Sequence, residues 1–434
     1  AVALDPKRQR TAPPADAVDI SVLCPCKNAL PWLPAAVRAP LLQLGLVCEV
    51  LVVDDWSTDG SSAWLDELAA ALGPARASVE RTGPSGEGGE ALNLAVVVPR
   101  RPTAATPNFG AEAAPASDRA ALVEPHASAA EVAVEVLASE SKCVLRVLSN
   151  RGHGQGAALQ TALDASRAPL IAHIEADDDY GPLRIMRMRE ALLGSMADAV
   201  FSAVELTGTN VTAGMTSYVQ WQNTLLTAEE LAGGRFVELP SLHQTGLYRR
   251  ASLDACAARV PGAAEAERAL VYRELSEWPV DYDFALRWFA CGHTAFKLPR
   301  GTGECLYSWR QHGSNGTRWQ GRCSLDALRA CKAHYFAKQL RESAESPRVQ
   351  LWSSGRTLEL WADALAAEGV QVAEKVEWNP KRPAPKELQC EPAARGACER
   401  GISRLFVYGM APVRARVSKV VVKQWDSALD FFAA

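Results

Sequence analysis

Acidic side chains gather directly after a segment with the pattern of a buried strand. Residues 170–180 read Leu-Ile-Ala-His-Ile-Glu-Ala-Asp-Asp-Asp-Tyr, so an apolar run ends in Glu175 and three aspartates. Asp54 and Asp55 end a second apolar run in the same way. Hard divalent cations prefer oxygen ligands, and the carboxyl ends of parallel strands meet at one edge of a sheet. We therefore expect a site for a cation and its phosphates, although helix capping and solvated loop acids are the alternatives for either motif alone.

Composition limits the class of protein. The chain has 434 residues and is 48% hydrophobic, which is enough for a core and for two domains. Lys and Arg number 46 against 50 Asp and Glu, so no global basic field indicates nucleic acid, although a local patch could bind it. No apolar run approaches the roughly 20 residues that cross a bilayer, so we expect a soluble protein without a membrane span.

Eleven cysteines are scattered along the chain without the spacing of a zinc site. We expect most of them to be reduced and buried, which favours a reducing compartment and a cytoplasmic location. The chain begins at Ala1, so an upstream targeting segment remains an alternative.

Alternating strand and helix patterns must position the acids. Apolar runs that end in turn residues predict strands, and amphipathic segments between them predict helices, an order that favours a parallel α/β sheet. We expect strands over 18–24, 49–54, 143–148, 170–174, 198–205 and 239–250, and helices over 31–44, 61–72, 157–166, 182–193, 217–234 and 281–291.

Composition shifts divide the chain into parts. Residues 1–17 are expected to form a flexible arm, and residues 18–340 the main domain. Residues 75–140 are expected to be a partly disordered insertion, with a lid over the site as the alternative. Residues 347–434 resemble half of a Rossmann unit, but their loop Ser-Ser-Gly-Arg at 353–356 lacks GxGxxG. We therefore expect a small, degenerate Rossmann-like α/β docking module rather than a dinucleotide site.

Several segments taken in order resemble a known family. They are Val-Leu-Cys-Pro-Cys-Lys-Asn at 22–28, Val-Val-Asp-Asp-Trp-Ser-Thr-Asp-Gly at 52–60, Asn-Arg-Gly at 150–152 and Glu-Ala-Asp-Asp at 175–178. In this order they resemble the signature of family 2 glycosyltransferases. The resemblance implies the GT-A fold, a Rossmann-like and mostly parallel sheet with helices on both faces. It also implies a nucleotide-sugar donor, usually a UDP-sugar, held with Mn²⁺ or Mg²⁺.

The resemblance assigns donor-binding roles. It implies that Pro25 and Asn28 line the nucleoside pocket and that Asp54 or Asp55 meets the uracil. The DxD-type motif of the family falls on Glu175 and Asp177, and it implies that Asp177 is a metal ligand. Glu at the first position departs from the family and changes the reach of the carboxylate by about one carbon–carbon bond, which leaves open whether it contacts ribose or metal.

A second departure concerns the phosphates. Leu159 stands where many family members carry a basic residue, so we expect Arg151 or Arg310 to compensate. The segment 306–312, Leu-Tyr-Ser-Trp-Arg-Gln-His, resembles the downstream aromatic-Arg-x-His element of the family. This likeness implies that Arg310 pairs with the diphosphate and His312 ligates the metal, with a surface histidine without a role as the alternative.

A further carboxylate is needed for an inverting transfer, because a base must take the proton of the attacking acceptor hydroxyl. In the family this base is the Asp of a Glu-Asp pair that opens a helix. Within Trp-Pro-Val-Asp-Tyr-Asp at 278–283, Val280 replaces the Glu and Asp281 takes the Asp position, with Asp283 as the second candidate. Capping of the helix is the alternative role, and both could coexist.

Residues 218–231 narrow the resemblance. They look like a segment of the beta-1,3-N-acetylglucosaminyltransferase-like group, which includes the queuosine-tRNA galactosyltransferase. That likeness implies a UDP-galactose donor and a modified tRNA base as acceptor. The alternatives are a protein or glycan acceptor, or a non-catalytic relative that binds nucleotide sugar or RNA. The sequence does not indicate an oligomeric state.

Overall fold

The computed structural model describes residues 18–81, 126–260, 263–264, 267–300, 306–315, 321–343, 347–383, 385, 402–409, 411–421 and 430–433. The expected arm at 1–17 and residues 82–125 of the expected insertion lie outside them. In these ranges, none of the helices has the length and apolar character needed to cross a membrane.

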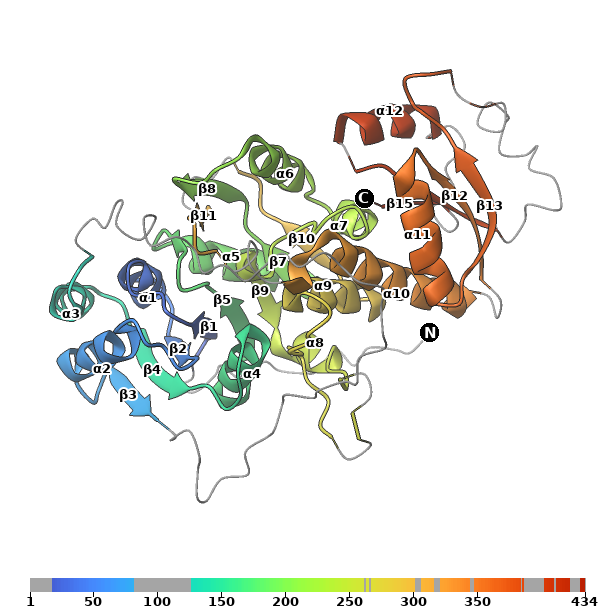
Figure 1. Ribbon diagram of the computed structural model, residues 1–434. Helices are drawn as coiled ribbons and strands as arrows, with labels where there is room; N and C mark the ends of the chain where they lie inside the picture. Colours follow the sequence, from blue (N-terminus) through green and yellow to red (C-terminus); the bar gives the residue numbers. More distant parts are fainter. Residues whose placement is uncertain are drawn as a thin grey trace, which may run out of the picture.

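The main sheet has the order β10-β7-β9-β5-β1-β2-β4-β3 (Figure 1). Strand β9 runs antiparallel to its neighbours β5 and β7, and the other neighbouring pairs are parallel. The strands are β1 (Ile20–Cys26), β2 (Cys48–Asp54), β3 (Ala77–Glu80), β4 (Val144–Ser149), β5 (Leu170–His173), β7 (Ala199–Phe201), β9 (Gly246–Arg249) and β10 (Ala295–Lys297). The predicted mostly parallel sheet is confirmed.

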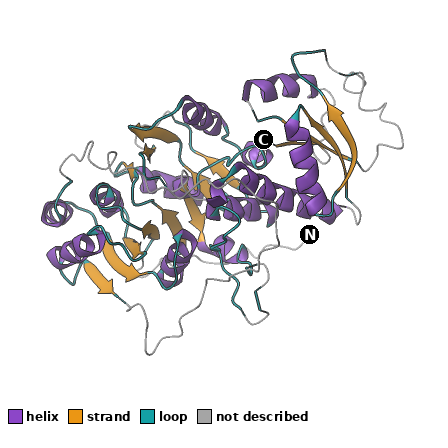
Figure 2. Ribbon diagram, in the orientation of Figure 1, coloured by secondary structure: helices purple, strands orange, loops and turns teal. Residues whose placement is uncertain are grey.

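Helices cover both faces of this sheet (Figure 2). Successive side chains of a strand point to opposite faces of the sheet, and in these buried strands both faces are apolar. Val22 and Val52 therefore belong to the apolar cluster on one face, whereas Leu23 and Val53 belong to the cluster on the other. The first cluster contains side chains of α1 (Leu33–Leu41), α2 (Ser61–Leu72), α3 (Ala129–Ala138) and α5 (Arg184–Leu193). The second contains those of α4 (Gln155–Ala165), α8 (Arg250–Ala255) and α9 (Val280–Ala290). The α/β class expected from the sequence is therefore confirmed.

Both described ends of the expected, partly disordered insertion over 75–140 form regular elements, and the insertion itself stays a prediction. Strand β3 pairs in parallel with β4 and extends the main sheet. At the other end, Ser128 and Glu131 form a reciprocal capping box that starts α3. The sequence of this region is rich in Ala and Glu, and its apolar runs are too short to have predicted β3 and α3.

Two segments that the sequence predicted as single elements each form two elements in the structure. The strand expected over 198–205 is split into β7 and β8 (Val204–Gly208), which belong to different sheets. The helix expected over 217–234 is split into α6 (Ala213–Thr224) and α7 (Ala228–Gly234). Thr227 and Glu230 form a capping box that restarts the helix.

A second, three-stranded sheet has the order β6-β11-β8. It joins β6 (Asp179–Tyr180) to β11 (Tyr307–Gln311) in antiparallel register, with Tyr307 opposite Tyr180. Strand β11 also runs parallel to β8. This small sheet therefore connects the acidic segment at 175–178 to residues that follow far later in the chain.

The C-terminal residues form a third sheet, β13-β12-β14-β15, in which all neighbours are parallel. Its elements are β12 (Arg348–Ser353), α11 (Arg356–Ala367), β13 (Gln371–Glu377), β14 (Ser403–Val407), α12 (Ala411–Val421) and β15 (Asp430–Ala433). Helix α10 (Leu325–Ser343) lies between this sheet and α9 (Figure 1). One apolar cluster contains Trp278 and Leu286 beside α9, Phe336 of α10 and Trp361 of α11. The division of the chain at 340 and 347 stays a prediction, but the two regions share this core.

Asp283 holds α9 in place. Its buried carboxylate accepts hydrogen bonds from Arg273 Nε at 3.0 Å, Arg287 Nη2 at 3.1 Å and Tyr335 Oη of α10 at 2.6 Å. Burial opposes ionisation of Asp283, but Arg287 and Arg273 outweigh it and hold the pKa of the carboxyl below its ordinary value. The second candidate for a catalytic base is therefore wrong, because this side chain points into the interior.

Replacing Asp283 with Asn should lower the free energy of unfolding at pH 7 by about 3–5 kcal/mol, because two buried guanidinium groups lose their counter-charge. A depressed folded-state pKa means that this stabilisation is present above the ordinary carboxyl pKa and is lost as pH falls through the folded value. The difference in free energy of unfolding between wild type and variant, measured by urea denaturation, should therefore become smaller in acid. The control is Asp164→Asn, which opens an ion pair with the exposed Arg268 and should cost less than about 1 kcal/mol. Equal losses in the two variants would contradict this assignment.

Candidate functional site

The strand order of the main sheet reverses at β1. From this strand the chain continues to β2 on one side, and β5 later adds on the other side. In open α/β sheets such a point leaves a crevice at the carboxyl ends of the strands, where ligands bind. The loops after β1, β2, β4 and β5 carry most of the predicted donor-binding residues.

Asp55 gathers the loops on one side of this edge. Its buried carboxylate accepts hydrogen bonds from Lys27 Nζ at 2.9 Å, Asn150 Nδ2 at 2.7 Å and the backbone N–H of Gly154 at 3.1 Å. These donors come from the loops after β1 and β4. Asp55 therefore lies where three loops meet.

The other predicted nucleoside residues have different environments. Asp54 Oδ2 accepts a hydrogen bond from Arg81 Nη1 at 3.1 Å, and Arg81 also pairs with Asp66 of α2. Asn28 has a φ of 50°, and its side-chain oxygen accepts a hydrogen bond from the backbone N–H of Thr58 at 2.7 Å. Pro25 is buried within β1. The carboxylate of Asp55, rather than that of Asp54, therefore contacts the loops after β1 and β4.

The two predicted metal ligands lie side by side. His312 Nε2 is 2.9 Å from Asp177 Oδ2, and Asn315 Nδ2 donates to the same oxygen at 3.3 Å. Trp32 stacks on the ring of His312 with 3.7 Å between centroids. Arg310 donates from Nε to the backbone carbonyl of Asp177 at 2.9 Å. Residues more than a hundred positions apart therefore form one cluster.

Asp178 and Tyr307 fasten the acidic loop to β11. The Tyr307 hydroxyl donates to Asp178 Oδ2 at 2.8 Å and accepts from the backbone N–H of Glu175 at 3.2 Å. The backbone N–H of Arg310 donates to Asp178 Oδ1 at 2.8 Å. Burial, together with the neighbouring Asp177, raises the pKa of Asp178. Asp178 thus has a structural role that the sequence did not indicate.

A divalent cation fits the donor set at Asp177 and His312. Two ligands at adjacent positions of an octahedral shell with bonds of about 2.1 Å lie about 3 Å apart, close to the observed 2.9 Å. The described residues contain no group of three or more His, Cys, Asp or Glu that could hold a metal alone. Mg²⁺-type sites commonly combine one or two protein ligands with substrate phosphates and water, so this pair is a sufficient protein contribution.

The tautomer of His312 bears on this fit. Its Nδ1 accepts a hydrogen bond from the backbone N–H of Ser314 at 3.2 Å, so a neutral ring carries its proton on Nε2 and donates it to Asp177. A cation bound at Nε2 requires the proton on Nδ1 instead, and the contact to Ser314 would then be given up.

Glu175 faces away from this pair. Its Oε1 accepts a hydrogen bond from Gln155 Nε2 at 3.0 Å and lies 3.2 Å from His243 Nε2. Gln155 is the first residue of α4, and His243 begins the short turn before β9. The longer side chain at the first DxD position therefore reaches α4 and the segment before β9.

Asp281 lies in the first turn of α9 and is half-buried. Its Oδ1 accepts a hydrogen bond from the backbone N–H of Tyr282 at 2.9 Å. Burial raises the pKa of Asp281, and the nearby His243 and Arg322 oppose this shift. Asp283, about 200° further around the helix, points to the opposite side, which explains why the two acids have different environments.

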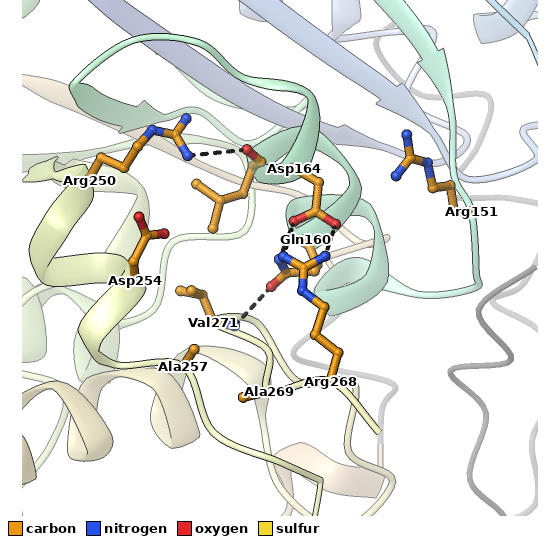
Figure 3. Close-up of a pocket in the computed structure, with 10 residues that line it drawn as sticks. Arg151, Gln160, Asp164, Arg250, Asp254, Ala257, Arg268, Ala269 and Val271 are labelled. Carbon is orange, nitrogen blue, oxygen red and sulfur yellow. Dashed lines mark hydrogen bonds and ion pairs between the residues drawn. The ribbon is translucent and has the colours of Figure 1, made fainter. Parts of the chain in front are cut away.

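Arg151 lies apart from these groups. It is exposed and lines a cavity of about 470 Å³ between α4 and α8 (Figure 3). On the same cavity Arg268 pairs with Asp164, as the figure shows. The remaining lining residues are Gln160, Leu163, Arg250, Asp254, Ala257, Ala269 and Val271. No contact joins Arg151 to the Asp177–His312 pair within the described residues, whereas Arg310 contacts that pair directly.

Three contributors were missed from the sequence. Tyr307 lies inside the segment that suggested His312, and its position two residues before Trp309 on a strand could have indicated a buried partner. Gln155 could have been suspected from its place at a helix start after a glycine loop. His243 carries no local signal, because its neighbours in sequence form no recognisable motif.

Comparison with known families identifies part of the chain. Residues 21–96 match the sequence model of a family described as Glycosyl transferase family 2. The matched segment includes Pro25, Asn28, Asp54 and Asp55, and it ends before the acidic loop at 175–178. No curated protein matches the chain.

Several solved structures are similar to this chain. TarS 1–349 of S. aureus in complex with UDP-GlcNAc is 12% identical, over 81% of this chain and 71% of that chain, with a TM-score of 0.44. The mannosyltransferase PcManGT from Pyrobaculum calidifontis, in complex with GDP-Man and Mn²⁺, is 12% identical over 95% and 89%, with a TM-score of 0.38. Glucosyl-3-phosphoglycerate synthase from Mycobacterium tuberculosis, with Mn²⁺ and UDP, is 15% identical over 74% and 79%, with a TM-score of 0.36. The chain covers 65% of TarS 1–349 in another structure and 40% of the TarS chain in a third.

Removal of one hydroxyl tests the role of Tyr307. Tyr307→Phe should lower the free energy of unfolding by about 1–3 kcal/mol, because Asp178 loses a donor and the N–H of Glu175 loses an acceptor. The neighbouring Tyr180 provides a matched control, because its buried hydroxyl has no hydrogen-bond partner in the described residues. Tyr180→Phe should be neutral or stabilising in the same denaturation experiment. If the two variants lose stability equally, Tyr307 does not fasten the loop.

Proposed function

We propose that the chain is a metal-dependent, inverting glycosyltransferase that moves a sugar from a UDP-sugar to an acceptor hydroxyl. The observation that carries this proposal is the pair of Asp177 and His312, which are 2.9 Å apart and join the acidic loop after β5 to the end of β11. Glu175 of the same loop lies 3.2 Å from His243, and both His243 and Arg322 are near enough to Asp281 to oppose the rise of its pKa. The match of residues 21–96 to family 2 glycosyltransferases supports the same reaction class.

Donor binding is assigned to the two ends of the edge. Asp55, where the loops meet, is proposed to accept a hydrogen bond from the uracil, with Pro25 near the end of β1 and Asn28 in the loop that follows it. Arg310 is proposed to pair with the diphosphate, because Nε is fixed on the carbonyl of Asp177 and a guanidinium has further N–H donors.

Asp177 and His312 are proposed to hold Mn²⁺ or Mg²⁺. When bound, the cation would offset the negative charge of the departing diphosphate. The protein's own contribution is to hold a carboxylate and an imidazole 2.9 Å apart. Trp32 restrains the imidazole by stacking on it.

Asp281 is proposed as the general base. The acceptor oxygen forms a bond to the anomeric carbon and gives its proton to Asp281, while the bond from that carbon to the diphosphate oxygen breaks on the opposite face. The products are the inverted glycoside and UDP. Burial of Asp281 raises its pKa and so makes the ionised carboxylate a better proton acceptor than an exposed aspartate.

The finer assignment is a galactose donor and queuosine in tRNA as acceptor. It rests on the resemblance of residues 218–231. In the structure, Tyr218 of this segment donates from its hydroxyl to the carbonyl of Leu239 at 3.0 Å, and Gln222 donates to the Tyr218 hydroxyl at 2.9 Å. These contacts link α6 to the loop that carries His243, so the segment supports the donor side of the site. Transfer to a protein or glycan keeps the same chemistry with another acceptor.

A non-catalytic nucleotide-sugar or RNA-binding protein is the second candidate. It is favoured by Leu159 of α4, which is fully buried and offers no basic group for the phosphates. Val280 in place of the family Glu favours it as well. Release of UDP from a UDP-sugar separates the two candidates, because a binding protein does not hydrolyse its ligand.

The first experiment measures UDP release by the wild-type chain from UDP-galactose, UDP-glucose, UDP-GlcNAc and GDP-mannose, with Mn²⁺ and with EDTA. Metal-dependent release from a UDP-sugar supports the proposal. Transfer is then measured with queuosine-containing tRNA against unmodified tRNA. Binding of UDP-sugars without any release would favour the second candidate, and transfer to neither tRNA would remove the tRNA assignment.

Asp281→Asn should lower the transfer rate by about 10²–10⁴-fold, the usual contribution of a general base, and leave the Kd for UDP with Mn²⁺ unchanged. In the wild type, kcat/KM should fall as pH drops through the pKa of Asp281, which lies above the ordinary aspartate value. This acid limb should disappear from the residual activity of the variant. Transfer at the wild-type rate in Asp281→Asn would exclude the assignment.

Asp177→Ala should reduce the affinity for UDP measured with Mn²⁺ to the value measured with EDTA, because one of two protein ligands is lost. Calorimetric titration with UDP checks this. Asp179→Asn is the control, since Asp179 begins β6 and its Oδ1 accepts from the backbone N–H of Tyr180. The metal assignment fails if Mn²⁺ strengthens UDP binding equally in wild type and Asp177→Ala.

A further inference from the structure

The imidazole of His243 is buried and makes no hydrogen bond through its ring nitrogens within the described residues. Its side chain is 6% exposed. Nε2 is close to Glu175 Oε1, at 3.2 Å, but the two groups are not aligned as a hydrogen bond. Buried polar groups are normally satisfied, and an unsatisfied one at a site calls for an explanation.

The backbone around His243 is firmly held. The Tyr248 hydroxyl donates to the carbonyl of His243 at 3.0 Å. Lys297 Nζ donates to the carbonyl of Pro240 at 2.9 Å, and Arg184 Nη2 donates to the carbonyl of Thr245 at 2.7 Å. Two buried basic side chains therefore fix the turn on both sides of the histidine. Its ring is presented by a rigid segment, as a recognition group requires.

The position of His243 indicates which part of a substrate it would meet. Glu175, two residues before the proposed metal ligand, lies 3.2 Å from the ring, and Asp281, the proposed base, is also near it. The base touches the attacking oxygen, and the cation touches the leaving diphosphate. The transferred sugar lies between these two groups, because its anomeric carbon is bonded to one oxygen and attacked by the other.

We propose that His243, together with Glu175, is a specificity-determining residue that hydrogen-bonds hydroxyl groups of the transferred sugar. This inference rests on the proposed function. A neutral imidazole has one donor and one acceptor, which match a hydroxyl, and the carboxylate of Glu175 accepts from a second hydroxyl. The extra methylene of Glu175 brings its carboxylate to His243 and away from Asp177. The departure from the family pattern at the DxD motif thereby acquires a role in sugar recognition.

The test compares ligands with and without the sugar. Calorimetry gives the Kd of UDP and of the preferred UDP-hexose with Mn²⁺, and kinetics give kcat and KM for that donor, its hydroxyl epimers and the deoxy analogues. His243→Ala should leave the Kd of UDP within about twofold, because UDP does not reach the ring. It should lower kcat/KM for the preferred donor by at least about tenfold and reduce discrimination against the epimer and the deoxy analogue, since sites that bind a hydroxyl reject ligands lacking it strongly.

His243→Gln, which keeps a donor and an acceptor, should recover part of the selectivity. If His243→Ala does not fold, His243→Phe is the decisive variant, because its ring has no donor or acceptor. The matched control is His293→Ala, which removes another largely buried ring whose Nε2 lacks a partner in the described residues, at the far end of α9. This control should keep the wild-type preference.

Two failures are distinguishable. If wild type binds UDP-sugars but turns none over, the proposed function fails, and the ratio of Kd values for UDP-hexose and UDP still tests the inference by binding alone. The inference is overturned, whatever the turnover, if that ratio and the preference among donors are unchanged in His243→Ala. The same holds for His243→Phe if His243→Ala does not fold.

Discussion

The pairing of a two-residue strand with a strand more than a hundred residues later is the contact on which the site depends. Strand β6 directly follows the acidic loop, and β11 directly precedes His312. Their antiparallel register, reinforced by the Tyr307 hydroxyl between Asp178 and the backbone of Glu175, brings Asp177 to His312. The fold itself therefore assembles the two proposed cation ligands, and the conformational entropy of bringing them together is lost on folding rather than on ligand binding.

The regular parts of the fold were predictable because their signals are local. Continuous apolar runs predicted β2, and the helix expected over 61–72 coincides with α2, which Gly60 and Gly73 bound with positive φ. The split of β7 from β8 and the reversed direction of β9 were missed. Both depend on which distant strand a segment pairs with, and a run of apolar residues looks the same in either direction.

In the site, residue types were predictable but environments were not. The order of motifs indicated both Asp54 and Asp55, yet only the positions of Arg81 and Lys27 distinguish their surroundings. Helix geometry could have separated Asp281 from Asp283, had the side of α9 that meets α10 been known. His243 needed the structure, because a single histidine outside a motif has no periodicity or spacing to interpret.

Helix α10 gives α9 and the C-terminal sheet one common interior. Trp278 contributes to it from the start of α9, Phe336 from α10, and Trp361 from the C-terminal α11. Because the two regions share one apolar core, a substitution in one region affects the packing of the other. A change of side-chain volume in the C-terminal sheet would therefore be felt by the packing of α9, the helix that carries the proposed base Asp281. Exchanging the C-terminal region for the equivalent part of another protein would disturb this helix as well as the region exchanged.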